Sequence, residues 1–392
     1  MSDLTPRVAV VHPRLVPGGG SEACAVWTLQ ALQDECRLTL ITMDSPDLPA
    51  IDEKYGTSLD GGRIEIRSLR VPLGMRKRFD ALRIFRLARY VRRHSGRFDA
   101  VISAYGLFDF GRRAIQRIGD FSFDDGLRRE LHGEGRGRWA LFYRKSAPRS
   151  LYLALGRALS GGSRVAWMKD RLVANSQWTR DLLRTRFGVP SEVIYPPVAG
   201  EMSLTPWSER ADGFVLMARL VPEKGILSVI EVLREVRRSR DVHLHILGRR
   251  DDPGHFRELE RARRENADWI FLEGEVYGAD KARFLAGHKY GISGCRHEAF
   301  GVAVAEMVRA GCLVWVPDGG GQTEIVAHPE LIYAGRDEAV AKVRRVLADP
   351  EKQTWLRDHL RARAGLFSAE RFVREMRALV WAFLKENHAG AA

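Results

Sequence analysis

The chain has 392 residues, of which 45% are hydrophobic, and it carries a formal net charge of +13. This length is too great for one ordinary core, so we expect two domains of about 150–200 residues each. The hydrophobic fraction argues against extensive disorder. The charge is compatible with nucleic acid, anionic lipid or a diphosphate as a partner, and it says nothing about catalysis.

Cysteine usage and the N-terminal segment bear on the compartment. The four cysteines are Cys24, Cys36, Cys295 and Cys312. No C-x-x-C pair occurs among them, which argues against a zinc knuckle or a redox motif and favours reduced, buried thiols. Residues 1–7 are polar, and no run of about 18 apolar residues occurs. We therefore predict a cytoplasmic protein without a signal peptide or a membrane span.

The first half of the chain alternates strands with helices. A β-branched run at residues 7–12 is followed by glycines and by an apolar-periodic helix, for which Ser21 is the expected N-cap. A second run at residues 37–42 completes a strand–helix–strand unit, which is typical of a parallel, doubly wound sheet. Further strands are predicted at residues 63–68, 98–103, 172–176 and 192–195.

The second half repeats this order. Strands are predicted at residues 213–218, 242–247, 269–272, 290–293 and 313–316, with a helix at 225–240 and a last amphipathic helix at about 369–387. We predict an α/β protein with an N-terminal domain at 1–198, a linker at 199–212, a second domain at 213–368, and a helix within 369–392 that packs back toward the N-terminal domain. Ligands of such sheets bind at the carboxyl ends of the strands, so we expect the site in a cleft between the domains.

The most specific motif places two glutamates, Glu298 and Glu306, with seven residues between them. Between them lies a small turn that opens a helix near Gly301, whose N–H groups and dipole suit a diphosphate. Carboxylates at the two positions could accept hydrogen bonds from the vicinal hydroxyls of a ribose or hexose. The spacing alone also fits two solvated glutamates beside a helix start, but the turn and the glycines at 319–321 favour a binding site.

A second motif places Arg219 at a strand end and Lys224 five residues later, in a turn that Pro222 opens. Arginine offers a fork to phosphate oxygens and lysine a point charge. Two unrelated surface cations are the alternative, but the strand-end position favours a phosphate site. The glycine-rich turn at 17–22 lacks the G-x-G-x-x-G spacing, which argues against a dinucleotide oxidoreductase.

Together these segments resemble the retaining glycosyltransferases of family 4, which have the GT-B fold of two Rossmann-like domains whose parallel sheets face a central cleft. The segment 298–306 resembles the family's E-x7-E signature, which implies that Glu298 contacts the transferred sugar and Glu306 the donor ribose. The resemblance also implies that Arg219 and Lys224 bind the diphosphate. The main chain of Phe300, Gly301 and Val302 would lie against the sugar and the diphosphate. Gly19 and Gly20 would contact the donor phosphate and the acceptor.

The N-terminal domain departs from the family at one place. Many relatives carry a histidine near its centre, where this chain has Asp120, while His132 is the other candidate for that histidine. We predict catalytic roles for Glu298, Asp120 and His132, with a solvated aspartate loop as the alternative for Asp120. The resemblance implies no metal or other cofactor, because Arg219, Lys224 and helix ends take the place of a cation.

Two basic segments bear on the acceptor. Residues 76–93 predict a basic amphipathic helix, and residues 128–149 form a second basic region. A helix packed on the core with a solvated basic face is the favoured interpretation. The alternative is peripheral binding to an anionic membrane on the inner face of the cell membrane, or to a lipid-diphosphate acceptor.

The sequence therefore predicts a hexosyltransferase that moves a mannose, glucose or N-acetylglucosamine type of sugar from a UDP- or GDP-sugar to a lipid-linked, glycan or small-molecule acceptor. The resemblance implies retention of anomeric configuration. The rivals are a phosphorylase-type or sugar-nucleotide-hydrolysing enzyme of the same fold, and a non-catalytic protein that binds nucleotide sugars or polyanions. Nucleic acid is not expected as a partner, because no zinc finger or aromatic RNP strand occurs.

Overall fold

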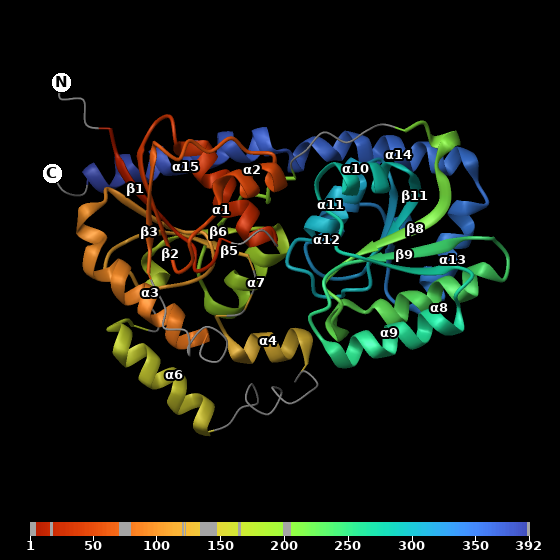
Figure 1. The fold of residues 1–392 in the computed structure, drawn as a ribbon, viewed down its shortest axis with the longest axis horizontal. Coiled ribbons are helices and arrows are strands. Elements are labelled where there is room, and N and C mark those ends of the chain that lie inside the picture. The colour runs from red at the N-terminus through yellow and green to blue at the C-terminus, as the bar shows by residue number, and fades with distance from the viewer. Residues whose placement is uncertain are drawn as a thin grey trace. The chain divides into compact units, whose positions relative to one another are not determined.

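The computed structural model describes residues 5–15, 19–69, 80–119, 121, 123–133, 147–163, 166–198 and 205–389 (Figure 1). The chain divides into two compact units. Unit 1 comprises Met1–Pro197 together with Ala369–Ala392, and unit 2 comprises Val198–Ser368. Within the described ranges, no helix is both long and apolar enough to cross a membrane.

Unit 1 is built on a seven-stranded parallel sheet with the order β3-β2-β1-β4-β5-β6-β7. The strands are β1 (Arg7–Val11), β2 (Arg37–Thr42), β3 (Ile64–Ser68), β4 (Ala100–Ser103), β5 (Ile115–Ile118), β6 (Arg171–Ala174) and β7 (Glu192–Val193). The strand order reverses between β1 and β4, as in doubly wound sheets.

Strand β5 was not predicted, because two of its four buried residues are polar. Gln116 donates to the Phe108 carbonyl at 2.6 Å, and Arg117 contacts the Cys24 sulfur at 3.4 Å.

The helices of unit 1 are α1 (Gly20–Leu32), α2 (Leu48–Tyr55), α3 (Asp80–His94), α4 (Asp125–His132), α6 (Ala147–Ser160), α7 (Gln177–Phe187) and α15 (Ala369–Ala389), with 3-10 turns at Ser95–Arg97 and Ala166–Lys169. Ser176 caps α7, since its hydroxyl accepts from Thr179 N at 3.0 Å. The predicted cap of α1 is wrong, because Gly19 occupies that position. The Ser21 hydroxyl instead lies in the first turn and donates to the Glu22 carboxylate at 2.8 Å.

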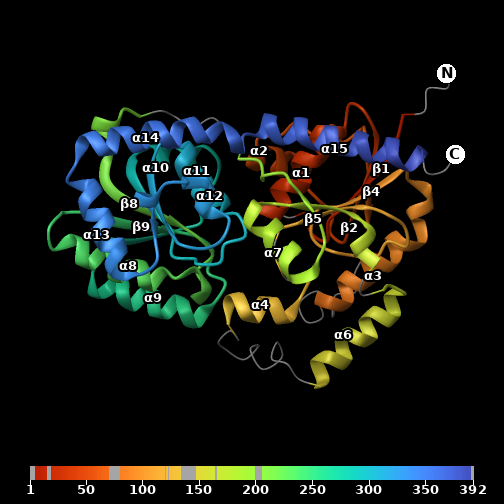
Figure 2. The same cartoon turned by 180° about the vertical axis from the view of Figure 1, so that it is seen from behind.

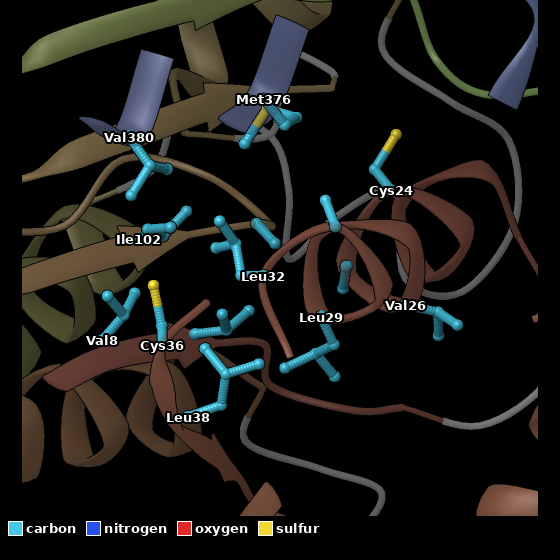
Figure 3. Close-up of a cluster of buried hydrophobic side chains, with 14 of the residues drawn as sticks. Val8, Cys24, Val26, Leu29, Leu32, Cys36, Leu38, Ile102, Met376 and Val380 are labelled. Carbon is cyan, nitrogen blue, oxygen red and sulfur yellow. The ribbon is translucent and has the colours of Figure 1, made fainter. Parts of the chain in front are cut away.

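The last helix, α15, completes the core of unit 1. Its buried apolar side chains recur at helical spacing: Phe372, Met376, Leu379, Val380, Phe383 and Leu384. Figure 3 shows Met376 and Val380 approaching Ile102 of β4 and Leu32 of α1. Burying one such side chain stabilises the fold by about 1.5–3 kcal/mol, so this stripe is a large part of the unit's stability.

Unit 2 contains a six-stranded parallel sheet with the order β10-β9-β8-β11-β12-β13. The strands are β8 (Ala211–Met217), β9 (His243–Leu247), β10 (Ile270–Gly274), β11 (His288–Ile292), β12 (Leu313–Pro317) and β13 (Ile332–Tyr333). The helices are α8 (Ile226–Arg237), α9 (Pro253–Glu265), α10 (Gly278–Ala286), α11 (Val302–Arg309), α12 (Gln322–Val326), α13 (Arg336–Leu347) and α14 (Pro350–Ala364), with 3-10 turns at Trp207–Glu209, Pro222–Lys224, Pro329–Leu331 and Gly365–Phe367. Helices α8, α9 and α13 cover one face of the sheet, and α10, α11, α12 and α14 cover the other (Figure 2).

Candidate active site

Three loops of unit 2 meet at the carboxyl ends of neighbouring strands. Strand β8 leads into residues 218–225, β11 into residues 293–301, and β12 into residues 318–321. These ends lie side by side because β11 pairs in parallel with both β8 and β12. The strand order reverses between β8 and β11, and this switch point is where ligands of doubly wound sheets bind.

Glycines allow the three loops to approach one another closely. Gly320 has φ +75°, and a Cβ there would lie 2.3 Å from the Glu298 carbonyl oxygen. The next residue, Gly321, donates its N–H to that same oxygen at 2.8 Å. A Cβ on Gly225 would lie 2.2 Å from the carbonyl oxygen of Gly294. The glycine turn after β12 therefore fixes the main chain around Glu298, and Gly225 brings the Lys224 loop against the loop after β11.

Lys224 and Glu298 form an ion pair at the centre of these loops. Their Nζ and Oε2 atoms are 2.5 Å apart, and the side chains are 16% and 28% exposed. Burial raises the pKa of Glu298, but the charge and hydrogen bond of Lys224, with smaller contributions from Cys295 and Arg219, hold the pKa below its usual value. Burial lowers the pKa of Lys224, yet the Glu298 carboxylate raises it overall. Both groups are therefore charged near neutral pH.

Cys295 lies beside this pair. Its sulfur is 3.8 Å from Lys224 Nζ. Burial and the negative charge of Glu298 raise the pKa of the Cys295 thiol to about 12. This thiol stays protonated near neutral pH, so it is a poor candidate for a nucleophile.

Arg219 extends the cationic side of the site. Its side chain is 55% exposed, and its guanidinium lies 3.8 Å from the carboxylates of Glu223 and Asp251. Neither ion pair is close, so the guanidinium could leave these carboxylates for phosphate oxygens at a small cost in free energy. The structure thus places both predicted phosphate-binding cations in the loop that follows β8.

Helix α11 presents its N-terminus to the same loops. Gly301 is its N-cap with φ +99°, and no side chain caps the helix. The N–H groups of its first turn have no intrahelical acceptor, so this end can bind an anion. Phe300 is 2% exposed, and its ring lies 5.6 Å from that of Phe367. Because that side chain is buried, only its main chain can face a ligand, as the sequence predicts for Phe300, Gly301 and Val302.

Glu306 pairs with a cation that sequence reasoning missed. Its Oε1 atom accepts a hydrogen bond from Lys281 Nζ of α10 at 2.7 Å, and the two side chains are 20% and 24% exposed. Lys281 lies 25 residues before Glu306, and no local pattern links the two. The structure therefore joins each glutamate of the predicted motif to its own lysine.

Of the site residues predicted in unit 1, the structure describes all but Asp120. Gly19 and Gly20 begin α1, and the Gly19 carbonyl accepts from the Tyr55 hydroxyl at 3.3 Å. Asp120 lies outside the described residues, and His132 is the last residue of α4. Their predicted catalytic roles stay predictions.

Sequence reasoning also passed over His12, which follows β1 at the switch point of unit 1. It is 1% exposed, and burial lowers its pKa to about 4. Its Nδ1 accepts from Arg14 N at 3.3 Å, its ring lies edge-on to Tyr105, and its Nε2 has no hydrogen-bond partner among the described residues. A buried neutral histidine at a strand end is a candidate for positioning a ligand. Its place at the end of the predicted strand was the available signal.

The family of the chain follows from comparison with known proteins. Residues 18–200 match the model of Glycosyltransferase Family 4, and residues 205–363 match that of Glycosyl transferases group 1. Sucrose-phosphate synthase from Thermosynechococcus elongatus superposes with a TM-score of 0.69 at 15% identity, covering 97% of this chain and 100% of that one. HepE of Anabaena in complex with UDP-glucose superposes with a TM-score of 0.68 at 14% identity, covering 96% and 100%.

A curated relative matches over a shorter region. The GDP-Man:Man(3)GlcNAc(2)-PP-Dol alpha-1,2-mannosyltransferase of Neurospora crassa is 26% identical over 282 residues, which are 62% of this chain and 47% of that protein. The chain thus spans about half the length of this relative.

The likeness to these solved structures shows the GT-B fold. The two family matches take in most of the chain, and it belongs to the family 4 type of glycosyltransferases. The predicted family and fold class are confirmed. The roles of individual residues stay predictions.

Proposed function

We propose that this chain transfers a hexose-type sugar from a UDP- or GDP-sugar to a lipid-linked, glycan or small-molecule acceptor, with retention of anomeric configuration. The observation that carries the proposal is the Lys224–Glu298 pair at the switch point of unit 2, next to Arg219 and the uncapped start of α11. The UDP-glucose in the HepE complex and the GDP-mannose in the name of the fungal relative support the two donor classes.

The charges of the site suit a diphosphate leaving group. Arg219, Lys224 and the N–H groups at the start of α11 would neutralise the negative charge that grows as the sugar departs. Glu298 would then accept hydrogen bonds from sugar hydroxyls, and Glu306 from the ribose. Because these groups supply the positive charge, we propose that the transfer needs no metal.

Retention requires the acceptor to approach from the face that the diphosphate leaves. The bond between the anomeric carbon and the phosphate oxygen breaks, and a bond from that carbon to the acceptor oxygen forms. The acceptor proton moves to the departing phosphate oxygen. No protein nucleophile takes part, which agrees with the protonated state of Cys295 beside Glu298.

A thermal-shift panel of UDP, GDP, ADP and TDP tests the donor site. We expect one nucleotide to raise the melting temperature of the wild type, because a ligand that binds only the folded state stabilises it by mass action. The same nucleotide should have little effect on Arg219→Ala and Glu306→Ala. A matched control is Arg250→Ala, which removes an exposed arginine that stacks on Phe256 and lies in the loop after the neighbouring strand β9.

The outcomes separate the rivals. If no nucleotide shifts the wild type, the donor site is wrong and a polyanion-binding role takes its place. If a nucleotide binds but no acceptor yields product, the protein is a binding module. With the donor known, proton NMR of the product gives the anomeric configuration, and an inverted product would contradict retention.

We further propose peripheral binding to an anionic membrane through helices α3 and α6, which pack against each other. The apolar face of α3 is used in the core, where Leu87 and Val91 are buried. Exposed apolar area lies instead on α6, where Leu151 and Leu155 are 61% and 54% exposed. A membrane surface would bury these leucines, while the basic residues of α3 attract anionic lipid. Residues 76–79 and 134–146 of the two predicted basic segments lie outside the described residues.

Co-sedimentation with liposomes measures this binding. We expect the wild type to pellet with vesicles that contain phosphatidylserine and to stay in solution with purely zwitterionic vesicles. The Leu151→Ser/Leu155→Ser variant should bind at least about 10-fold more weakly, because two apolar side chains no longer leave water. Leu366→Ser is the control, since it removes an exposed leucine of unit 2. Equal partitioning onto both vesicle types would rule the proposal out.

A further inference from the structure

Three histidines gather at the amino ends of two strands in unit 2. His243 and His245 lie two residues apart on β9 and so share a face of the sheet, and His288 begins β11. Their ring centroids are 4.8–5.6 Å apart. One ring nitrogen from each histidine lies within 4.8 Å of the other two.

The sheet makes room for this cluster. Strand β8 runs between β9 and β11, and Gly213 is its register partner of His243. A Cβ on Gly213 would lie 2.0 Å from His243 Nε2, so only glycine allows the imidazole to cross over β8 toward His288. The absence of a side chain at this position is thus what brings the three rings together.

Hydrogen bonds orient two of the rings. His245 Nδ1 is 2.6 Å from a carboxylate oxygen of Glu273, and His288 Nδ1 is 2.7 Å from the Phe284 carbonyl. Since both partners accept, each Nδ1 carries the proton and each Nε2 keeps its lone pair. Carboxylates and carbonyls hold metal-binding histidines in this same way.

Aromatic side chains pack against two of the histidine rings, and the third ring has no hydrogen bond among the described residues. Phe271 stacks on His245 and Phe284 on His288, which limits the rotation of both imidazoles. Within the described part of the chain, no hydrogen bond reaches either ring nitrogen of His243. Neither ring nitrogen of His243 is fully buried, so both remain accessible to solvent and to an ion.

We propose that His243, His245 and His288 bind a divalent transition metal, Zn²⁺ in particular, with water as the fourth ligand. Neutral imidazoles favour zinc and its neighbours in the first transition row over Mg²⁺ or Ca²⁺. Bonds of about 2.0–2.1 Å at tetrahedral angles place the nitrogens about 3.3 Å apart. The nitrogens now lie within 4.8 Å of one another, and His243, which no hydrogen bond or stacked ring of the described residues holds, would make most of the movement that closes the cluster onto an ion.

The position of the cluster indicates a structural role. It lies at the amino ends of β9 and β11, whereas the candidate active site lies at the carboxyl ends of the sheet. A metal here would link β9 to β11 directly, and would link both to β10 and α10 through Glu273 and Phe284. The proposal is therefore independent of the donor site, for which no metal is proposed. His245 and Glu273 are 16% and 30% exposed, which leaves a route for the ion from solvent.

The test uses the full chain without an affinity tag, stripped of metal with a chelator. We expect one Zn²⁺ per chain in competition with a chromophoric chelator, and Co²⁺ should give the intense visible bands of a tetrahedral site. His245→Ala should raise the Kd for Zn²⁺ at least about 100-fold. Glu273→Gln, which keeps all three ligands, should raise it about 10–100-fold. His359→Ala removes another partly buried histidine of unit 2 and should leave the Kd unchanged.

Circular dichroism of the metal-free variants shows whether each still folds, and Glu273→Gln keeps the test valid if a histidine variant does not. Absence of Zn²⁺ binding by the wild type would overturn the proposal. So would binding that persists in both His243→Ala and His245→Ala, or that is lost in His359→Ala.

Discussion

Replacing Lys224 with alanine is expected to raise the Kd for the donor nucleoside diphosphate about 100-fold. Lys224 is the less exposed of the two cations in the phosphate loop, and the change removes a charge-assisted hydrogen bond of about 1.5–3 kcal/mol. It also leaves the Glu298 carboxylate without its counter-ion, next to the anion that must bind. Isothermal titration with the nucleotide identified by the thermal-shift panel measures the effect.

Lys289→Ala is the matched control. The Lys289 side chain is also 16% exposed, and its ammonium lies 3.0 Å from Asp212, but it belongs to the amino-terminal half of β11. This variant should leave the Kd unchanged. The double variant Lys224→Met/Glu298→Gln should recover stability without recovering affinity, because it removes the buried charge but not the need for a cation. An unchanged Kd in Lys224→Ala would remove this lysine from the donor site.

Replacing Gly320 with alanine is expected to lower the free energy of unfolding by about 3 kcal/mol. The left-handed φ of +75° costs a residue with a side chain about 1 kcal/mol or more. In addition, the new Cβ would lie 2.3 Å from the carbonyl oxygen of Glu298 and 2.7 Å from its nitrogen, and main-chain atoms cannot move aside cheaply. Urea unfolding followed by circular dichroism measures the change.

Gly335→Ala provides the comparison for this experiment. Gly335 is the N-cap of α13, with an extended backbone, and a Cβ there would meet no atom within 4 Å. The free energy of unfolding should fall by no more than about 1 kcal/mol, the cost of alanine at a helix N-cap. Because the clash falls on Glu298, Gly320→Ala should also weaken nucleotide binding. A Gly320→Ala protein as stable as the wild type would contradict the tight turn seen after β12.

The fold could be predicted because its signals are local. Alternating β-branched runs and amphipathic helices mark a doubly wound sheet within windows of about ten residues. Strand β5 escaped this reasoning because Gln116 and Arg117 are buried through contacts with Phe108 and Cys24, which no local pattern indicates. The cap of α1 was misassigned because Gly19 and Ser21 are both acceptable caps, and the Glu22 carboxylate decides between them by engaging the serine.

The candidate site shows the same division. Sequence reasoning found the four charged residues of the site because each lies in a short motif at a strand end or helix start: Arg219, Lys224, Glu298 and Glu306. Their partnerships were not found, since Lys224 and Glu298 are 74 residues apart and Lys281 and Glu306 are 25 apart. Such pairs depend on how strands are ordered in the sheet, which sequence spacing does not contain.

The discontinuity of unit 1 has a consequence for biosynthesis. Its core needs the apolar stripe of α15, yet that helix is translated only after residues 198–368 have been made. Unit 2 is contiguous and can begin to fold as soon as it leaves the ribosome, while α1 and β4 still lack their cover. The nascent chain therefore carries an incomplete N-terminal core through the synthesis of the whole second unit, and chaperones have the most reason to bind it during that interval.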